Sequence, residues 1–416
     1  MGFIPGVIAV ASMAAGMILS GFFDWNVIEP SKKSAFDPRA ASAVLTTLAG
    51  GAITVAALVL SITMVVLSSA SSQYGPRLLP NFIRKPGTKL AMGGFFGSFA
   101  YQIMVASALG LGERVPDLAV WVGIFGSLGA FAILLVFVHM VAKFIQVPFI
   151  IDEVTSDLHK ALKEAARVKS EAMDSRGSAF SAAGPSVDLI ADQDGYIQVI
   201  HTAGLIDAAR EMDGIIVSTV GIGSFVPRGG LLAKIHGRRP DDEEADALRG
   251  FMAVGPSRTE SNDTEYAIRQ LVEIAVRALS PGINDPHTAI NAIERLGGAF
   301  AGVAATGVSP GILTDEEGCV RLVIPLPSVS DLFDAAYHPL RQHARGVEEV
   351  AIALLDSYRM IAALKLHADV KSALERHAEF LRIDFENESP AAEDLRLFHL
   401  RFQDFKERLA DQESKA

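Results

Sequence analysis

Long runs of apolar residues dominate the first 143 positions of the chain. A helix that crosses ~30 Å of hydrocarbon needs about 20 mostly apolar residues, because each residue adds ~1.5 Å. Four segments meet that length, at residues 3–23, 43–69, 90–111 and 118–142. The pattern therefore predicts an α-helical membrane domain with four transmembrane helices within residues 1–145.

The spacing of apolar residues changes after this region. Residues 146–186 begin as an amphipathic connecting helix and end in a linker of small and polar residues. Residues 187–250 alternate apolar and polar positions between turn glycines, which is typical of β-strands. Residues 251–327 have the pattern of a helix–turn–helix block with a short β element, and residues 328–416 have the period of helices. We therefore expect a cytoplasmic α+β domain with a small β-rich subdomain and C-terminal helices.

The second apolar segment carries a polar stripe. Hydroxyl side chains recur in it every seven residues, at Thr47, Thr54, Ser61 and Ser68. A period of seven keeps one face of a helix turned toward a common axis in a left-handed bundle. Because lipid offers no hydrogen-bond partner, we expect this face to lie against protein or water.

Two interpretations of the stripe remain open. Small and hydroxyl residues allow helices to approach closely, so the stripe fits helix packing. Hydroxyl groups also replace part of the hydration shell of an ion, so the stripe is also compatible with the lining of a pore. In a pore, Leu60 or Met64 would form a constriction, and the inner mouth would hold Ser72 and Arg77. No Asp, Glu, Lys or Arg lies inside the four segments, which argues against a pump or a proton-coupled transporter.

The distribution of charged residues differs between the two parts of the chain and predicts its orientation in the membrane. Residues 1–143 carry nine Lys/Arg and five Asp/Glu, whereas residues 144–416 carry 28 and 43. An acidic soluble half argues against nucleic acid as a partner. Eight basic residues lie in the loop after the second span and in the segment after the fourth, against four in the other two loops. The positive-inside rule then predicts that both termini are cytoplasmic.

The soluble half contains a polar motif in two parts. The first part opens a helix and the second forms a tight turn before the next helix, and together they include Arg258, Thr259, Asp263, Ser280, Asn284 and Asp285. One interpretation is a catalytic pocket for phosphate or metal, which would gather Arg258, Asp263, Asn284, Asp285 and His287. The other is helix capping with an ionic network, because Asp, Asn and Ser are frequent N-cap residues.

Other sequence signals of enzymes are missing. The chain has no G-x-x-x-x-G-K-[ST] pattern and no H-E-x-x-H pattern. Cys319 is the only cysteine, so one chain cannot form a disulfide or a cysteine-based metal site. We therefore expect no enzyme activity, no cofactor and no metal site.

Three stretches carry a family resemblance: GPSRTESNDTEYAIRQLVEIAVRALSPGINDPHTAINAIERL in the soluble half, and LSITMVVLSSASSQYGPRLLPNF and GGFFGSFAYQ in the membrane half. The chain resembles, over nearly its whole length, the domain-of-unknown-function 2254 family of bacterial predicted membrane proteins. This resemblance implies a multi-pass protein of the bacterial inner membrane. It implies no activity, so the function has to come from the residues.

We interpret the chain as an oligomeric ion channel in which the second helix lines the pore and the cytoplasmic domain regulates it. One copy offers little room for a hydroxyl-lined path, so the expected partners are membrane lipid, inorganic ions and further copies of the chain. The alternative is a non-conducting membrane sensor or scaffold whose cytoplasmic domain binds a partner or ligand. A third interpretation, which lacks the usual motifs, is a membrane-bound hydrolase using Arg258, Asp263, Asp285 and His287.

Overall fold

The computed structural model describes residues 3–20, 36–74, 86–111, 117–144, 146–174, 185–259, 263–308, 311–388 and 390–413. The chain forms two compact units, Met1–Phe149 and Ile150–Ala416. Each unit has a hydrophobic core of its own.

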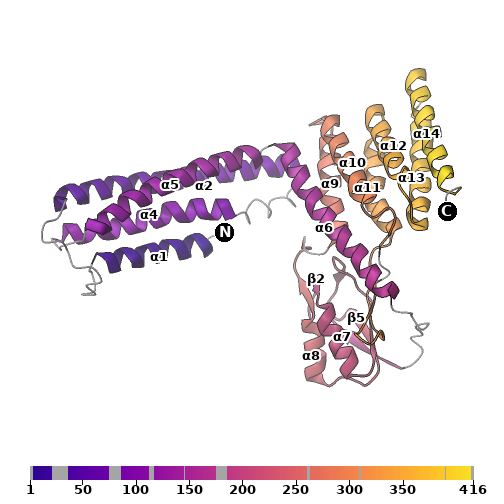
Figure 1. Ribbon diagram of the computed structural model, residues 1–416, viewed down its shortest axis with the longest axis horizontal. Helices are drawn as coiled ribbons and strands as arrows, with labels where there is room; N and C mark the ends of the chain where they lie inside the picture. The colour runs from indigo at the N-terminus through magenta and orange to yellow at the C-terminus, as the bar shows by residue number, and fades with distance from the viewer. Residues whose placement is uncertain are drawn as a thin grey trace. The chain divides into compact units, whose positions relative to one another are not determined.

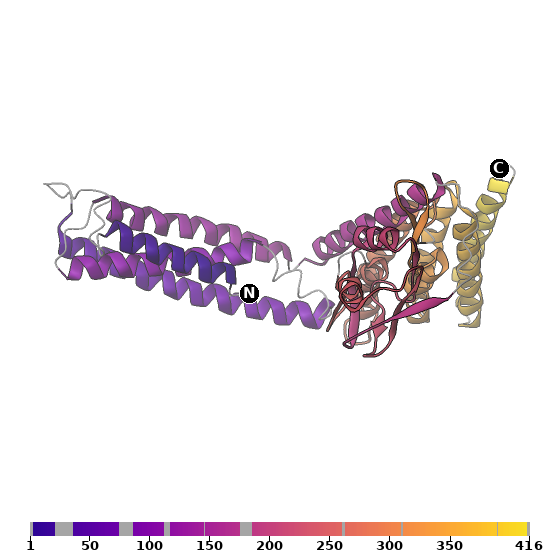
Figure 2. The same ribbon diagram turned by 90° about the horizontal axis from the view of Figure 1, so that it is seen from below.

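The first unit is a bundle of helices that run side by side (Figures 1 and 2): α1 (Phe3–Leu19), α2 (Pro38–Tyr74), α4 (Pro86–Gly110) and α5 (Asp117–Phe144). Helix α4 is the central element, since it packs against α1, α2 and α5. Two glycines of α4 let α1 approach closely. A Cβ atom at Gly93 would lie 2.6 Å from Ile8 Cδ1, and one at Gly97 would lie 2.7 Å from Ser12 Oγ.

Three of these helices are long and apolar enough to cross a membrane, namely Pro38–Ser72, Gly87–Gly110 and Asp117–Lys143. The apolar helix Ile4–Leu19 is shorter. With its 17 residues, α1 spans about 25 Å, which is less than the ~30 Å of a hydrocarbon core. The sequence predicted a first span that continues to residue 23, and residues 21–23 lie outside the described residues. Within the described residues, three helices thus reach the length of a full span, whereas the sequence predicted four.

One face of α2 packs into the bundle against α4 and α5. From Leu45 onward, its buried side chains recur with the spacing of a heptad seam: Leu45, Ala49, Ala52, Ala56, Val59, Thr63, Val66 and Ala70. Alanine occupies half of these positions, and small residues allow the backbones of membrane helices to approach closely. This seam, rather than the hydroxyl stripe, holds α2 in its own bundle.

A buried polar cluster ties α4 to α5. The amide nitrogen of Gln102, which is fully buried, is shared between Ser98 Oγ at 2.9 Å, Gly123 O at 3.2 Å and Ser127 Oγ. Hydrogen bonds between helices satisfy polar groups that lipid cannot satisfy. We therefore interpret the cluster as a structural contact that holds α4 and α5 together.

The second unit begins with the amphipathic helix α6 (Val147–Asp174), of which residues from Ile150 onward belong to this unit. Its apolar face is buried, through Ile150, Ile151, Val154, Leu158 and Leu162. The remaining part of the unit consists of a β-rich part and an array of helices.

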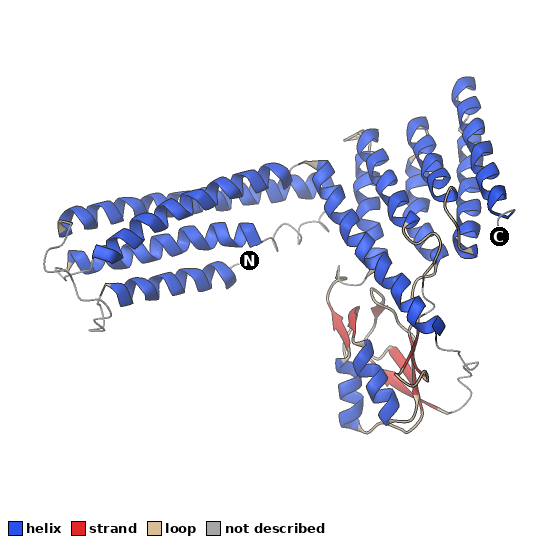
Figure 3. Ribbon diagram, in the orientation of Figure 1, coloured by secondary structure: helices blue, strands red, loops and turns tan. Residues whose placement is uncertain are grey.

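The β-rich part contains two sheets (Figure 3). Its strands are β1 (Ser186–Ile190), β2 (Gly195–Ile200), β3 (Ile215–Ser218), β4 (Phe225–Val226), β5 (Leu231–His236), β6 (Met252–Gly255), β7 (Ile312–Thr314) and β8 (Val320–Val323). One sheet has the order β1-β5-β3-β8-β7 and the other β4-β2-β6. Helices α7 (Thr202–Glu211) and α8 (Asp242–Gly250) connect strands and complete a shared apolar core.

The strand β8 corrects the expected grouping of elements. The sequence placed this short β element with the helix–turn–helix block of residues 251–327. In the structure it pairs in parallel with β3, with Ile216 opposite Leu322 and Val217 opposite Val323. A pairing between distant segments leaves no trace in local periodicity. The β-rich part therefore draws on two separate stretches of the chain.

The helical array contains α9 (Thr264–Ala278), α10 (Pro286–Ala301), α11 (Val329–His343), α12 (Glu348–Ala362), α13 (Ala368–Asn387) and α14 (Ala392–Glu413), which lie in a row (Figure 1). Alternate helices pack together, α10 with α12, α11 with α13 and α12 with α14. Charged pairs cross two of these contacts: Arg341–Asp384 and Arg376–Asp334 join α11 to α13, and Arg359–Asp404 joins α12 to α14. Buried rings such as Phe333 and Tyr337 fill the interior.

Candidate functional site

The hydroxyl stripe of α2 lies on the outer side of its own bundle. Thr47, Thr54, Ser61 and Ser68 are all exposed in the single chain, opposite the buried heptad seam. Thr47 Oγ1 donates to Ala43 O and Thr54 Oγ1 donates to Gly50 O, both at 2.8 Å. Packing against α1, α4 or α5 therefore does not account for the stripe.

The other residues assigned to a pore lie as follows. Leu60 is 39% exposed and Met64 is 59% exposed, so both project outward beside the stripe. Ser72 Oγ donates to Ser69 O at 2.8 Å near the end of α2. Arg77 lies outside the described residues. Helix α2 has 37 residues, about 55 Å at ~1.5 Å per residue, so it is longer than a ~30 Å hydrocarbon core.

The outer face of α5 differs from that of α2 in chemistry. It presents large apolar side chains, namely Trp121, Phe125, Leu128, Phe131 and Leu135. Such a face is suited to lipid. The exposed side of α2 instead combines the stripe hydroxyls and two glycines with apolar side chains beside them, such as Leu58, Met64 and Val65. Only the stripe itself thus favours polar surroundings.

In the second unit, the first part of the polar motif forms a nearly buried ion pair. Arg258 Nε donates to Asp263 Oδ2 and Arg258 Nη2 to Asp263 Oδ1, both at 2.8 Å. Asp263 Oδ1 also accepts from the backbone N–H of Tyr266 at 2.9 Å and so caps α9. Burial opposes the charge of Arg258, but the hydrogen bond and charge of Asp263, with Glu265, raise its pKa above the ordinary value. Thr259 Oγ1 donates to Gln198 O at 3.3 Å beside the pair.

Gly223 is fitted tightly against this ion pair. Its φ is +83°, in the left-handed region that favours glycine. A Cβ atom there would lie 2.3 Å from Asp263 Oδ2 and 2.6 Å from Arg258 Nη2. The turn before β4 and the start of α9 are therefore built around the same two side chains.

The second part of the motif is a helix-capping turn. Asn284 has a φ of +48°, and its backbone N–H donates to Ser280 O at 2.9 Å. Asp285 caps α10 by accepting from the N–H of Thr288 at 3.1 Å and from its hydroxyl at 2.6 Å. Pro286 occupies the first turn of α10, where its missing N–H costs nothing.

Helix α9 keeps the two parts of the motif apart. It has 15 residues, which is about 22 Å at ~1.5 Å per residue. Asp263 caps its first turn, and Ser280 follows its last. The catalytic pocket that would gather Arg258, Asp263, Asn284, Asp285 and His287 is therefore wrong within one chain. The capping and ionic-network interpretation is confirmed.

A cavity of about 190 Å³ lies beside Asp263. Most of its lining is apolar and comes from α6, β2, the β7–β8 hairpin and α11, including Ala161, Ile200, Leu313, Ile324 and Leu332. Asp263 and Thr264 contribute polar groups. A space of this size holds several water molecules or a small ligand.

Sequence reasoning missed one cluster of side chains. Asp334 and His338 lie four residues apart on α11, and they meet His377 of α13. Each of the three residues has one nitrogen or oxygen atom that could bind a metal ion, and these atoms lie within 4.8 Å of one another. The Asp-x-x-x-His spacing was visible in the sequence, but the third member lies on a different helix. Only the fold brings it into place.

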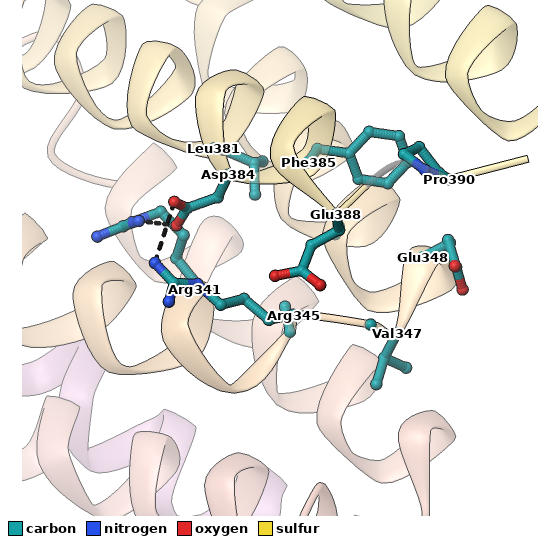
Figure 4. A pocket seen from close by; sticks show the side chains of 12 residues that line it. Arg341, Arg345, Val347, Glu348, Leu381, Asp384, Phe385, Glu388 and Pro390 are labelled. Carbon is teal, nitrogen blue, oxygen red and sulfur yellow. Dashed lines mark hydrogen bonds and ion pairs between the residues drawn. The ribbon is translucent and has the colours of Figure 1, made fainter.

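A pocket further along the same two helices is too small for a ligand. Figure 4 shows Asp384 beside Arg341 and Arg345, and its Oδ1 accepts from Arg345 Nη2 at 3.1 Å. The pocket has a volume of about 20 Å³, which is room for about one water molecule. We interpret it as a structural contact between α11 and α13.

Comparison with known proteins places the chain in a family. The family described as "Predicted membrane protein (DUF2254)" matches residues 1–360. The chain belongs to this family. The resemblance stated from the sequence motifs is thereby confirmed, and the DUF2254 match ends within α12, before α13 and α14 begin.

Mycobacterial proteins are among the relatives. The chain is 27% identical over 335 residues to the uncharacterised protein Rv1290c of Mycobacterium tuberculosis (strain ATCC 25618 / H37Rv) and to Mb1321c of Mycobacterium bovis (strain ATCC BAA-935 / AF2122/97). Each match covers 78% of this chain and 64% of the relative. The chain thus spans 64% of the length of these relatives. No solved structure matches the chain significantly.

Proposed function

We propose that the protein is a homo-oligomeric ion channel of a bacterial inner membrane, in which the outer face of α2 lines the path. The single observation that carries this proposal is the exposure of Thr47, Thr54, Ser61 and Ser68 on the side of α2 that its own bundle leaves uncovered. A heptad-spaced face stays turned toward one axis, so several copies of α2 can surround a common path.

The chemistry of the exposed faces supports this arrangement. The large side chains on α5, such as Phe125 and Leu128, suit lipid. The hydroxyls of α2 suit water and ions, because each can still accept a hydrogen bond from outside. Copies assembled through α2 would therefore place each face in the surroundings that fit it.

The placement of charge supports passive conduction rather than pumping. In the described parts of α1, α2, α4 and α5, the Lys, Arg, Asp and Glu side chains lie close to helix ends, at Arg39, Lys89, Asp117 and Lys143. A path lined by hydroxyl dipoles has no fixed charge to bind an ion tightly. In this proposal α1 also crosses the membrane, and both termini are cytoplasmic. The partners are membrane lipid, inorganic ions and further copies of the chain. The second unit regulates conduction and catalyses no reaction.

Ion flux from liposomes tests the proposal. The full chain, purified without a tag and reconstituted, is expected to release entrapped ions. Ser61→Leu should abolish the flux, because it replaces a hydroxyl of the path by a bulky apolar side chain. Ser61→Asp should instead favour cations, because it adds a ring of negative charge.

Ser107→Leu is the matched control. Ser107 is exposed on α4, and its hydroxyl donates to Ile103 O at 2.7 Å, as the stripe threonines bond within their own helix. This variant should conduct like the wild type. Flux that is equal in the wild type and Ser61→Leu would overturn the assignment of α2 as the path.

A non-conducting sensor is the second candidate, and the cavity of about 190 Å³ beside Asp263 favours it. In that case the wild type gives no flux under any salt, pH or tension. The stripe would then serve contact between copies, and Ser61→Leu would change only the oligomeric state.

A further inference from the structure

Two histidines and one aspartate meet between α11 and α13, and none of them belongs to the motif that caps α9 and α10. Asp334 Oδ1 lies 2.9 Å from His377 Nε2 and 3.3 Å from His338 Nε2. His377 is fully buried, whereas the side chains of Asp334 and His338 are 34% and 35% exposed. The cluster is therefore buried on the side of His377 and accessible to solvent on the side of Asp334 and His338.

The hydrogen bonds of this cluster are incomplete. The Nδ1 atoms of His338 and His377 and the Nε atom of Arg376 are buried without a partner. Three donors, from His338, His377 and Arg376, converge on one oxygen of Asp334, although a carboxylate oxygen has two lone pairs. The unpaired Nδ1 atoms are not on the side of each ring that faces Asp334, so the observation that points to an ion is the convergence of three donors on one oxygen.

We propose that Asp334, His338 and His377 bind a divalent transition-metal ion of the zinc class. Two imidazoles and a carboxylate are a ligand set that zinc accepts, with water in a further position. Bonds of 2.0–2.1 Å in a tetrahedron place ligand atoms ~3.3 Å apart. The recorded separations of 2.9 and 3.3 Å between ring nitrogens and Asp334 Oδ1 are close to that spacing. The proposed site departs from our expectation, drawn from the sequence, that the chain has no metal site.

A second group of possible ligands in the described residues, Asp315 with Glu317 and Cys319, is less suited to a metal ion. Arg321 and two backbone N–H groups already bind Asp315 there.

Arg376 is the competing cation at the site. Its Nη2 donates to Asp334 Oδ1 and to Ser330 Oγ, the latter at 2.9 Å. A divalent ion on Asp334 requires this guanidinium to move toward solvent, and the Arg376 side chain is 39% exposed. Metal binding and the Arg376–Asp334 pair thus exclude each other. Removing the guanidinium should therefore strengthen metal binding, whereas a purely structural network predicts no such gain.

Metal titration of the full, tag-free chain in detergent tests the proposal. After chelation and dialysis, Zn²⁺ should bind in one equivalent per chain. Co²⁺ in its place should give visible absorption bands of a four-coordinate site, a readout that depends on coordination and not on any activity. The experiment is independent of ion conduction, so its outcome does not depend on the proposed channel.

Variants assign the ligands. His338→Ala should weaken Zn²⁺ binding by at least the ~10–100-fold that loss of an outer-shell partner costs, and it should remove the Co²⁺ bands. Arg376→Gln should tighten binding several-fold, because it removes the competing cation. His399→Ala is the control, since His399 is exposed and pairs with Glu386 away from the site.

Circular dichroism of each variant shows whether it is folded, and the wild-type Co²⁺ spectrum needs no variant at all. The proposal is overturned if the wild type binds no metal in stoichiometric amount. It is also overturned if a folded His338→Ala variant binds as the wild type does, or if Arg376→Gln leaves the affinity unchanged.

Discussion

The carboxylate of Asp263 joins three parts of the second unit at one point. It pairs with Arg258, caps α9 through the N–H of Tyr266, and lies against Gly223 of the turn before β4. Only 2% of the Asp263 side chain is exposed. Removing one partner of such a pair leaves a nearly buried charge without compensation, which costs more than the pair itself contributes.

Asp263→Ala is therefore expected to lower the free energy of unfolding by about 3 kcal/mol, since it leaves Arg258 unpaired and uncaps α9. Urea unfolding followed by circular dichroism measures the change. Glu393→Ala is the control, because it removes an exposed ion pair with Arg396 and should leave the midpoint unchanged. Equal midpoints for the two variants would show that the Arg258–Asp263 pair does not support the fold.

The cap of α10 has a pH dependence of predictable sign. The hydrogen bond from the Thr288 hydroxyl lowers the pKa of Asp285 below its ordinary value of 3.8. A group whose pKa is lower in the folded state contributes stability that is complete above its unfolded pKa and is lost as the pH falls through its folded pKa.

Asp285→Ala should thus cost about 1 kcal/mol at neutral pH, the usual cost of losing a cap. The difference from the wild type should shrink below about pH 4, where Asp285 takes up a proton. Urea midpoints between pH 3 and 7 follow the effect. A difference that stays constant over this range would mean that the ionised carboxylate is not what caps the helix.

The sequence predicted the role of a residue correctly where its partner lies close to it in the chain. Asp263 and Asp285 act on backbone groups three residues away, so the order of residue types alone predicts their capping. His377 acts on Asp334 of another helix, and nothing in the local sequence predicts that contact. The proposed catalytic pocket failed for the opposite reason, because residues close in the sequence are held apart by α9.

At the scale of elements, α2 has two faces with separate tasks. The buried seam that includes Ala56 holds α2 against its own bundle. The stripe that includes Ser61 faces outward. Both faces repeat every seven residues, so the period alone does not say which face packs inside the chain. The structure separates them by burial.

The same substitution type on the two faces should have different effects. Ala56→Leu inserts bulk into a fully buried seam position, and overpacking of this kind costs about 1–3 kcal/mol. Its thermal midpoint in detergent should therefore fall. Ser61→Leu should keep the midpoint, because the Ser61 side chain is exposed in the single chain. A similar loss of midpoint in Ser61→Leu would place the stripe inside the fold of the single chain.

Elements with a strong local period were predictable, and elements defined by pairing were not. The apolar periods of α9 and α10 predicted two helices around a turn, and both are present. The strand β8 joined a sheet whose other members lie far earlier in the chain. Helix α1 was predicted as a full span from its apolar composition, yet its described helix ends at Leu19.

At the scale of the whole molecule, the chain consists of two units with separate cores. Hydropathy predicted this division, because a long apolar half and an acidic half cannot share one solvent. The side of the membrane on which the second unit lies is a separate matter. It follows only from the distribution of Lys and Arg among the loops.

Cys319 provides a direct test of that side, because it is the only cysteine of the chain and its thiol is free and exposed. A membrane-impermeant maleimide should label it in inside-out vesicles and should not label it in right-side-out vesicles until detergent is added. The reverse pattern is expected for Gly112→Cys in a Cys319→Ser background, since Gly112 belongs to the loop that the charge rule places outside. Labelling of Cys319 in intact right-side-out vesicles would put the second unit outside the cytoplasm. A regulatory role for that unit from the cytoplasmic side, and the inner mouth assigned to the end of α2, would then both have to be abandoned.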